Sequence, residues 1–365
     1  MKINIAAPQI GKEEIKAVTE VLKSGVIAQG PKVAELEEKF AKFIGVKFAI
    51  ATSSGTTALH GALLAHGIGP GDEVITSPFT FIASANSILY TGARPVFVDI
   101  DEETFNIDPE NIEKAINKKT KAIMPIHLYG SSCNMTKIMA IAKKHKLVVI
   151  EDACQSHGAE WRGKKVGSFG TGTFSLYPTK NMTTGEGGMI TTNDKDIYEK
   201  ACLIRAHGSK VRYYHDILGY NFRMTDIEAV IGIEQLKKLP KFNKVRQKNA
   251  GYLSKNLSGI AGLITQYIDK NITHVFHQYT IRITSEFGLS RDEVNKKLNE
   301  AGIGTAVFYP LPINEQKVYK SLGYKSDTPI AKKVSNEVLS LPVHPGLKKS
   351  DLRYIVRTLK VISQK

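Results

Sequence analysis

The sequence contains few cysteines and no long apolar run. Its three cysteines, Cys133, Cys154 and Cys202, lie far apart and leave one unpaired in any bridging scheme, which excludes a disulfide framework. They form no Cys-x-x-Cys or Cys/His cluster, so we expect no metal. No uncharged apolar stretch approaches the roughly 18 residues that cross a bilayer, and residues 1–9 lack the apolar core of a signal peptide. We therefore expect a cytoplasmic protein with no membrane partner.

Acidic residues are scarce relative to basic ones. The 365 residues include 50 Lys or Arg against 35 Asp or Glu, which gives a formal charge of +15. Residues 237–255 hold seven basic residues and no acidic one. This excess raises the question of a DNA-binding regulator. Because the sequence shows no helix-turn-helix pair, zinc cluster or basic zipper, we expect no nucleic-acid partner.

Apolar periodicity predicts an α/β fold. Two helical segments, 13–24 and 31–44, come first, and Ile15, Val18 and Leu22 lie on one face of the first segment. Short β-rich runs then alternate with helical windows, a pattern typical of a largely parallel sheet covered by helices. These runs cover residues 48–51, 73–76, 95–99, 122–126 and 147–150.

The pattern changes after residue 150. Two further runs, 173–176 and 188–192, have little helix between them, so we expect one strand of different direction in this part of the sheet. Thr225 and Glu228 form a capping box that opens a helix. Within the basic stretch that follows we place a domain boundary, which gives a large domain over 1–244 and a smaller α+β domain over 245–365.

Polar and aromatic residues follow several of these strands, where open α/β sheets bind their ligands. Ser54, Gly55 and Thr56 open a helix after the first strand, and free N–H groups at a helix start can hold a phosphate. An ordinary capped helix start would look the same. Phe81 follows the second strand, where a core phenylalanine is the alternative reading.

Charged residues follow the later strands. Glu151 and Asp152 come directly after a buried run, so one of them should meet a cation, although Asp152 could equally cap the next turn. Lys180 leaves a strand edge before a glycine-rich turn, 28 residues after Asp152. A lysine there is usually a solvated surface group, but the predicted sheet brings these segments to one edge.

Six ordered segments together resemble the DegT/DnrJ/StrS-type nucleotide-sugar aminotransferases, from about residue 8 to about residue 360. They are Ser-Gly-Thr-x-Ala-Leu at 54–59, Thr-Phe-x-Ala-Ser-Ala-Asn at 80–86, Val-Ile-Glu-Asp-Ala-Cys-Gln at 149–155, Phe-Ser-x-Tyr-Pro-Thr-Lys-Asn at 174–181, Gly-Glu-Gly-Gly at 185–188 and Gly-Tyr-Asn-Phe-Arg-Met-Thr at 219–225. The resemblance implies a pyridoxal 5'-phosphate enzyme of fold type I, the aspartate-aminotransferase-like fold. That fold has a mostly parallel sheet and a smaller α+β C-terminal lobe.

The resemblance also implies roles for residues of the cofactor site. Lys180 would be the Schiff-base lysine and the general base and acid of the reaction. Asp152 would pair with the pyridinium nitrogen of the cofactor. Phe81 would stack on its ring, and Gln155 would contact the region of its ring hydroxyl.

The phosphate of the cofactor would be held by two subunits. Gly55 and Thr56 would contribute N–H groups and Ser175 a hydroxyl, as the resemblance implies. In relatives the residue matching Asn221 reaches the phosphate of the neighbouring subunit. We therefore expect a homodimer with two shared active sites.

The implied reaction is ping-pong transamination, because relatives that remove oxygen from sugars have histidine where Lys180 stands. L-Glutamate would donate the amino group to a nucleotide-diphosphate-linked keto-sugar, at C4 of a 4-keto-6-deoxy sugar. Glutamine-dependent amination of an inosose, for aminocyclitol synthesis, is the alternative.

Arg223 and Tyr309 are the candidate substrate contacts, although an interface salt bridge is an equal alternative for Arg223. Relatives often have histidine where Phe308 and Asn314 stand.

Overall fold

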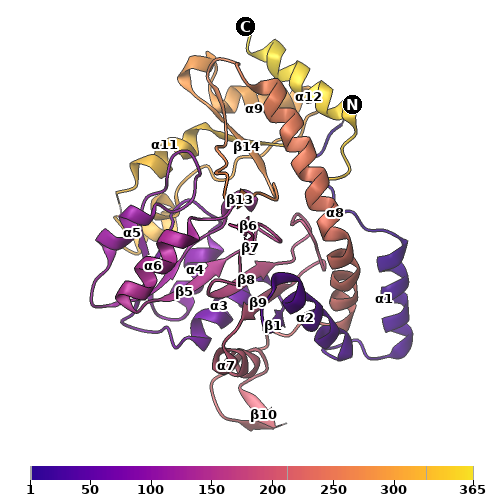
Figure 1. The fold of residues 1–365 in the computed structure, drawn as a ribbon, viewed down its shortest axis with the longest axis vertical. Coiled ribbons are helices and arrows are strands. Elements are labelled where there is room, and N and C mark those ends of the chain that lie inside the picture. Colours follow the sequence, from indigo (N-terminus) through magenta and orange to yellow (C-terminus); the bar gives the residue numbers. More distant parts are fainter. Residues whose placement is uncertain (1, 212, 326, 365) are drawn as a thin grey trace.

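A seven-stranded sheet forms the centre of the computed structural model, which describes residues 2–211, 213–325 and 327–364 (Figure 1). The strands lie in the order β1 (Phe48–Thr52), β9 (Gly188–Thr192), β8 (Thr171–Ser175), β5 (Val148–Asp152), β4 (Thr120–Met124), β2 (Glu73–Thr76) and β3 (Arg94–Phe97). Strand β9 is antiparallel to both neighbours, and all other pairs are parallel. The α/β fold and the strand of different direction are therefore confirmed.

Helices cover both faces of this sheet. On one face α3 (Gly55–Ala65) and α7 (Lys195–Arg205) pack against apolar side chains such as Ile50 and Ile150. The opposite face packs against α2 (Pro31–Ile44), α5 (Pro109–Ala115), α6 (Met135–His145) and part of α8 (Asp226–Leu257). Successive strand residues point to opposite faces, so Ile150 and its neighbour Val149 belong to different core clusters.

Helix α8 links two hydrophobic cores, as its long diagonal course in Figure 1 shows. It begins at the predicted capping box, in which the Thr225 hydroxyl accepts from the Glu228 N–H and the Glu228 carboxylate accepts from the Thr225 N–H. Leu239 packs in the core below the sheet, whereas Ala250 packs in a second core. The boundary proposed at 244/245 thus falls inside a continuous helix.

The second core lies in the C-terminal part of the chain. A three-stranded antiparallel sheet of β12 (Leu263–Thr265), β14 (Tyr279–Ile283) and β15 (Val338–Leu341) packs with α9 (Arg291–Glu300) and α12 (Lys349–Ile362). Ile3 joins this core and pairs with Ile303. The remaining elements are α4 (Ala83–Tyr90), η1 (Leu128–Gly130), β6 (Glu160–Trp161), β7 (Lys164–Lys165), β10 (Ser209–Val211), β11 (Tyr214–His215), β13 (Ile272–Thr273), η2 (Ser285–Phe287), η3 (Ile313–Glu315), α10 (Lys317–Ser321) and α11 (Pro329–Glu337).

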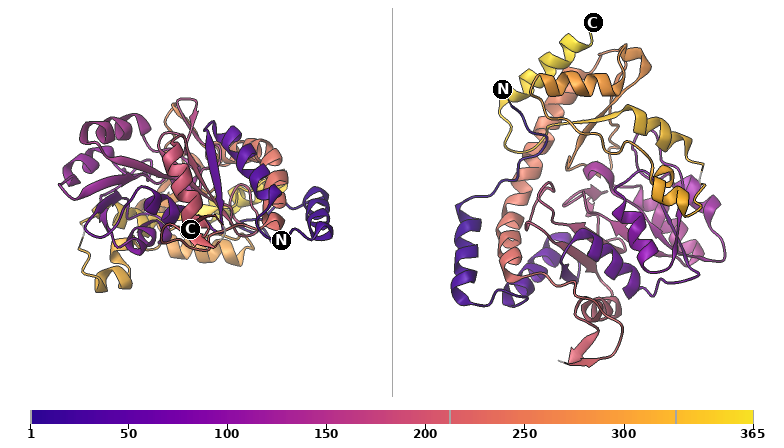
Figure 2. Two further views of the ribbon diagram at one scale, coloured as in Figure 1. Left: turned by 90° about the horizontal axis from the view of Figure 1, so that it is seen from below. Right: turned by 180° about the vertical axis from the view of Figure 1, so that it is seen from behind.

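Helix α1 (Lys12–Ser24) turns two residues of its predicted apolar face outward. Ile15 and Leu22 are 63% and 56% exposed, whereas Glu14 is buried. The Glu14 carboxylate accepts hydrogen bonds from Lys238 and Gln235 of α8, each at 2.7 Å. This polar contact sets which face of α1 meets α8, and α1 stands at the side of the molecule (Figure 2). The apolar face that the sequence pattern predicts is therefore only partly covered in the single chain, where Val18 is half-buried.

Among the described residues, no helix is long and apolar enough to cross a membrane. The same residues contain no group of three or more His, Cys, Asp or Glu side chains placed to hold a metal ion.

Candidate active site

The site residues predicted from the sequence lie at one edge of the central sheet. Strands β1, β2, β5 and β8 run in the same direction, so their carboxyl ends share this edge. Strand β5 pairs directly with β8, with Asp152 opposite Thr173. The strand order therefore brings together segments that are more than 100 residues apart in the sequence.

The first helix turn after β1 meets the end of β8 closely. A Cβ atom at Gly55 would lie 2.6 Å from the Cβ of Ser175, so only glycine fits there. Ser54 caps α3 by accepting from the Thr57 N–H. The N–H groups of Gly55 and Thr56 precede the first bonded turn of α3, and among the described residues they have no hydrogen-bond partner. Free N–H groups beside the half-buried Ser175 make a site suited to a phosphate.

Asp152 is fixed at the end of β5 by neutral donors. One carboxylate oxygen accepts from the Ser84 hydroxyl at 2.7 Å, and the other accepts from the Cys154 N–H at 3.1 Å. Asp152 is buried, yet it forms no ion pair with another described residue. A buried carboxylate in this state is well placed to meet a cationic group of a ligand.

Lys180 follows β8 and lies close to Asp152. Its Nζ has no hydrogen bond or ion pair with the other described residues. Burial lowers the pKa of the Lys180 ammonium, and the nearby Cys154 and Asp152 oppose this shift. A lowered pKa increases the fraction of neutral amine, which is the form that attacks a carbonyl carbon.

Phe81, Gln155 and Tyr309 lie along the same edge. The Phe81 ring is 57% exposed and lies 6.4 Å from the Tyr309 ring, measured between centroids. Gln155 is buried, and its Nε2 donates to the Tyr309 hydroxyl at 3.2 Å. An exposed aromatic face at this edge is available to a planar ligand.

Asn221 and Arg223 lie beside the start of α3, because the N–H of Ser53 donates to the Phe222 carbonyl at 2.8 Å. Asn221 is exposed and Arg223 is half-buried. Neither side chain makes a hydrogen bond or ion pair within the described part of the chain. A backbone hydrogen bond thus holds these two residues near the site, but their side chains make no bond to it.

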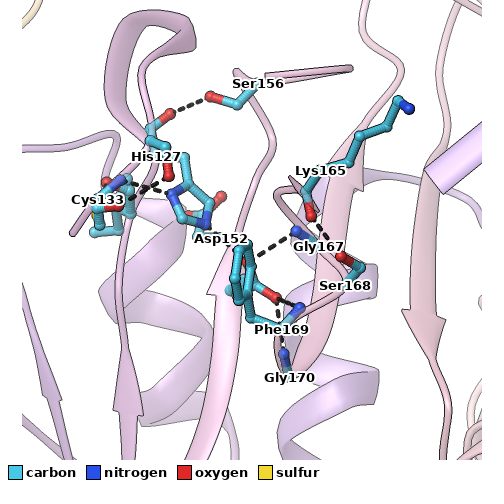
Figure 3. Close-up of polar contacts among 12 residues, drawn as sticks. His127, Cys133, Asp152, Ser156, Lys165, Gly167, Ser168, Phe169 and Gly170 are labelled. Atoms are coloured by element: carbon cyan, nitrogen blue, oxygen red, sulfur yellow. Dashed lines mark hydrogen bonds and ion pairs between the residues drawn. The ribbon is translucent and has the colours of Figure 1, made fainter. Parts of the chain in front are cut away.

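Glu151 has a role that the sequence analysis did not identify, and Figure 3 labels its four partners, which are His127, Gly167, Phe169 and Gly170. It points away from Asp152 and is fully buried. Its carboxylate accepts from His127 Nε2 at 3.1 Å and from three backbone N–H groups of residues 167–170 at 2.8 to 2.9 Å. His127 Nδ1 accepts from the Cys133 N–H, so this ring carries its proton on Nε2.

Glu151 therefore meets an imidazole and backbone donors in place of a cation. Burial would raise the pKa of Glu151, but the hydrogen bond from His127 and those from the N–H groups of Gly170 and Gly167 outweigh burial and lower it. The bonds join β5 to the loop that leads into β8. The charged pair after a buried strand was visible in the sequence, but its partners were not.

Residues 8–360 match the model of the DegT/DnrJ/EryC1/StrS aminotransferase family. The chain belongs to this family. The sequence resemblance is therefore confirmed, and the protein is an aminotransferase.

Curated members of the family align over nearly the whole chain. A "Pleiotropic regulatory protein" of Geobacillus stearothermophilus is 46% identical, covering 96% of this chain and 94% of its own length. A GDP-perosamine synthase of Caulobacter vibrioides is 43% identical, covering 98% and 97%. A UDP-N-acetyl-3-dehydro-alpha-D-glucosamine 3-aminotransferase of Acidithiobacillus ferrooxidans is 40% identical, covering 95% and 93%.

Solved structures of sugar aminotransferases have the same fold. PseC of Helicobacter pylori, an aminotransferase of pseudoaminic acid biosynthesis, superposes with a TM-score of 0.94 at 31% identity and covers 100% of both chains. The PLP-form of the putative sugar aminotransferase Spr1654 of Streptococcus pneumoniae gives 0.94 at 29% identity and covers 100% and 99%. The fold of this aminotransferase is therefore the fold of PLP-dependent sugar aminotransferases.

The Glu151 contacts predict a pH-dependent loss of stability on substitution. Glu151→Gln should destabilise this aminotransferase by about 3 kcal/mol at neutral pH, because an amide turns an NH2 group toward backbone donors. The folded pKa of Glu151 lies below the unfolded value, so the carboxylate stabilises the fold above about pH 4.3 and loses this effect as the pH falls further.

Urea unfolding of both proteins between pH 3.5 and about pH 8 measures the difference. The difference in unfolding free energy between the two proteins should shrink below about pH 4.3. Glu38→Gln, at an exposed glutamate without a hydrogen-bond partner among the described residues, is the matched control. A constant difference at all pH values would contradict the assigned role of Glu151.

Proposed function

We propose that this aminotransferase uses pyridoxal 5'-phosphate to move an amino group from L-glutamate to a nucleotide-diphosphate-linked keto-sugar, at C4 of a 4-keto-6-deoxy sugar. The observation that carries the proposal is the arrangement of the sheet edge, where Asp152 ends β5 beside β8 and the end of β8 at Ser175 meets Gly55. Lys180 follows β8, and Asp152 acts on its pKa. A reactive amine, a buried carboxylate and a phosphate site at one sheet edge match the three polar parts of this cofactor.

The residues present fit pyridoxal phosphate. The free N–H groups of Gly55 and Thr56 and the Ser175 hydroxyl would hold its phosphate, because the approach of α3 to β8 leaves no room for a side chain at Gly55. Asp152 would meet the ring nitrogen of the cofactor. Phe81 would stack its exposed ring on the cofactor ring, and the buried Gln155 would contact the region of the ring hydroxyl.

Lys180 would be the residue of the protein that transfers the proton in the reaction. When bound, the cofactor acts as an electron sink that makes the α-proton of the amino donor removable. The Lys180 amine has a lowered pKa, so it would accept that proton at Nζ and deliver it to the aldehyde carbon of the cofactor. Asp152, held by Ser84 and the Cys154 N–H, would keep the ring nitrogen protonated through this transfer.

The keto-sugar assignment rests on relatives and on one segment of this chain. A GDP-perosamine synthase is 43% identical, whereas a UDP-linked 3-aminotransferase is 40% identical. The segment from Gly219 to Thr225 resembles the 4-amino-sugar and inosose branches. Arg223 and Tyr309 would contact the substrate.

The proposed active form is a homodimer with shared sites. A hairpin of β10 and β11 projects from the base of the molecule in Figures 1 and 2. Val211 and Leu218 at this hairpin are 62% and 83% exposed, and apolar side chains on a projecting arm favour a covering partner. Asn221 follows the arm in the sequence, so a second copy that covers the arm would also approach Asn221.

A turnover screen tests the substrate. The protein, loaded with pyridoxal phosphate, is incubated with nitrogen-15-labelled glutamate and UDP-, GDP- or dTDP-linked 4-keto-6-deoxy sugars, and mass spectrometry follows label in the sugar. We expect label in one of these sugars and none with Lys180→Ala. No label in these sugars, with label in a nucleotide-linked 3-keto sugar assayed in parallel, would contradict the C4 assignment. In a second parallel assay, faster amination of scyllo-inosose with labelled glutamine would favour the inosose alternative.

Subunit complementation tests the shared site. Lys180→Ala and Asn221→Asp should each be inactive, the second because its carboxylate would repel the phosphate. After unfolding and refolding together, half of the dimers are hybrids with one intact site, so about a quarter of wild-type activity should return. Mixing Lys180→Ala with Lys180→Arg is the control that should restore nothing. No recovery in the first mixture would show that Asn221 serves its own subunit.

A further inference from the structure

Tyr129 holds an unusual backbone conformation beside the site. It lies in η1 directly after β4, is fully buried, and has a φ of 59°. Left-handed φ values are rare for bulky residues and persist only where surrounding contacts enforce them. Here the Tyr129 carbonyl accepts from the Gln278 N–H at 3.1 Å, and the Gly130 carbonyl accepts from the Val275 N–H at 2.9 Å.

The Tyr129 N–H fixes the orientation of the Gln155 amide. It donates to Gln155 Oε1 at 2.9 Å. A backbone N–H can only donate, so the Gln155 oxygen must face Tyr129 and its NH2 group must face the other way. That NH2 group donates to the Tyr309 hydroxyl at 3.2 Å. The Tyr309 oxygen is therefore an acceptor toward Gln155, and its own proton is left for another partner.

The Tyr129 hydroxyl contacts the segment that contains Tyr309. It donates to the carbonyl of Phe308, the residue before Tyr309. One residue thus fixes Gln155 through its backbone and the Tyr309 segment through its side chain. Burial raises the pKa of both tyrosines above their usual value, so both hydroxyls keep their protons at neutral pH.

Tyr309 lies against the cofactor residues proposed above. Its ring is 6.4 Å from the rings of Phe79 and Phe81, and the charge of Asp152 adds to the effect of burial in raising the pKa of Tyr309. The hydroxyl is therefore near the edge of the sheet that Asp152 and Phe81 define. A proton donor there suits an anionic oxygen of a bound molecule.

We propose that Tyr129 is a positioning residue that aims the Tyr309 hydroxyl proton at an anionic oxygen in the active site. The inference rests on the proposed function for the identity of the bound molecule, which is the cofactor or the substrate. The orientation of Gln155 and Tyr309 rests only on the contacts within the chain.

A double-mutant cycle tests whether the effect of Tyr129 on kcat requires the Tyr309 hydroxyl. Tyr309→Phe should lower kcat by about tenfold to a hundredfold, because one preorganised donor is lost. Tyr129→Phe keeps the ring and the N–H but loses the bond to Phe308, and we expect a loss of about fivefold. The double variant should be no slower than Tyr309→Phe alone, since both changes remove one effect.

Tyr279→Phe is the matched control, because it removes the hydroxyl of another buried tyrosine. That hydroxyl bonds to Ser254 at 3.0 Å within the C-terminal core. We expect kcat to stay within about twofold of wild type, with a fall in melting temperature similar to that of Tyr129→Phe. Additive losses in kcat for Tyr129→Phe and Tyr309→Phe would overturn the proposal.

Fluorine NMR supplies a readout that is independent of activity. In protein labelled with 3-fluorotyrosine, the Tyr309 resonance is identified by its absence in Tyr309→Phe. It should move in Tyr129→Phe without any cofactor, and Tyr279→Phe should leave it in place. An unmoved resonance in Tyr129→Phe would overturn the positioning role even if the enzyme is active.

Stepwise addition of ligands separates the two sources of the anionic oxygen. A shift of the Tyr309 resonance with pyridoxal phosphate alone assigns the oxygen to the cofactor, and a shift only after glutamate or nucleotide sugar assigns it to the substrate. No shift with either overturns the donor role of Tyr309. If the resonance moves in Tyr129→Phe but no amination is found in any assay, the proposed function fails while the positioning role stands.

Discussion

The end of strand β5 is the constraint on which the rest of the site depends. Two adjacent carboxylates point to opposite sides of the sheet, as strand geometry requires. Glu151 binds His127 and the N–H groups of the loop before β8, which ties β4, β5 and β8 into one unit. Asp152 is thereby held at the ligand edge by Ser84 and the Cys154 N–H. Buried charge is tolerated here because each oxygen has a donor.

Helix α8 connects the large domain to the C-terminal part of the chain, because it packs in the hydrophobic cores of both. The basic stretch within it serves the fold in two places: Lys238 binds the buried Glu14, and the buried Arg246 donates to the carbonyls of Phe276 and His277. The 275–278 segment in turn clamps the Tyr129 turn. Part of the excess positive charge thus has a structural partner inside the molecule, and Lys241, Lys244 and Lys248 remain exposed.

Local patterns predicted the element order, the antiparallel strand and the Thr225 capping box, because periodicity and caps depend on residues that are close in the sequence. The resemblance assigned cofactor roles to Lys180, Asp152 and Gln155, and these roles stay predictions. The outward turn of Ile15 could not be predicted, since it depends on the contact of Glu14 with α8. Tyr129 was likewise missed, because its role arises from a turn conformation and from contacts 26 and 179 residues away.

Lys180 is the residue that we propose binds the cofactor covalently. Borohydride reduction of the protein loaded with pyridoxal phosphate, followed by proteolysis and mass spectrometry, locates the attachment directly. We expect a phosphopyridoxyl group on the peptide that contains Lys180 and none on the Lys180→Ala variant. Attachment at a different lysine, or equal labelling of both proteins, would contradict it.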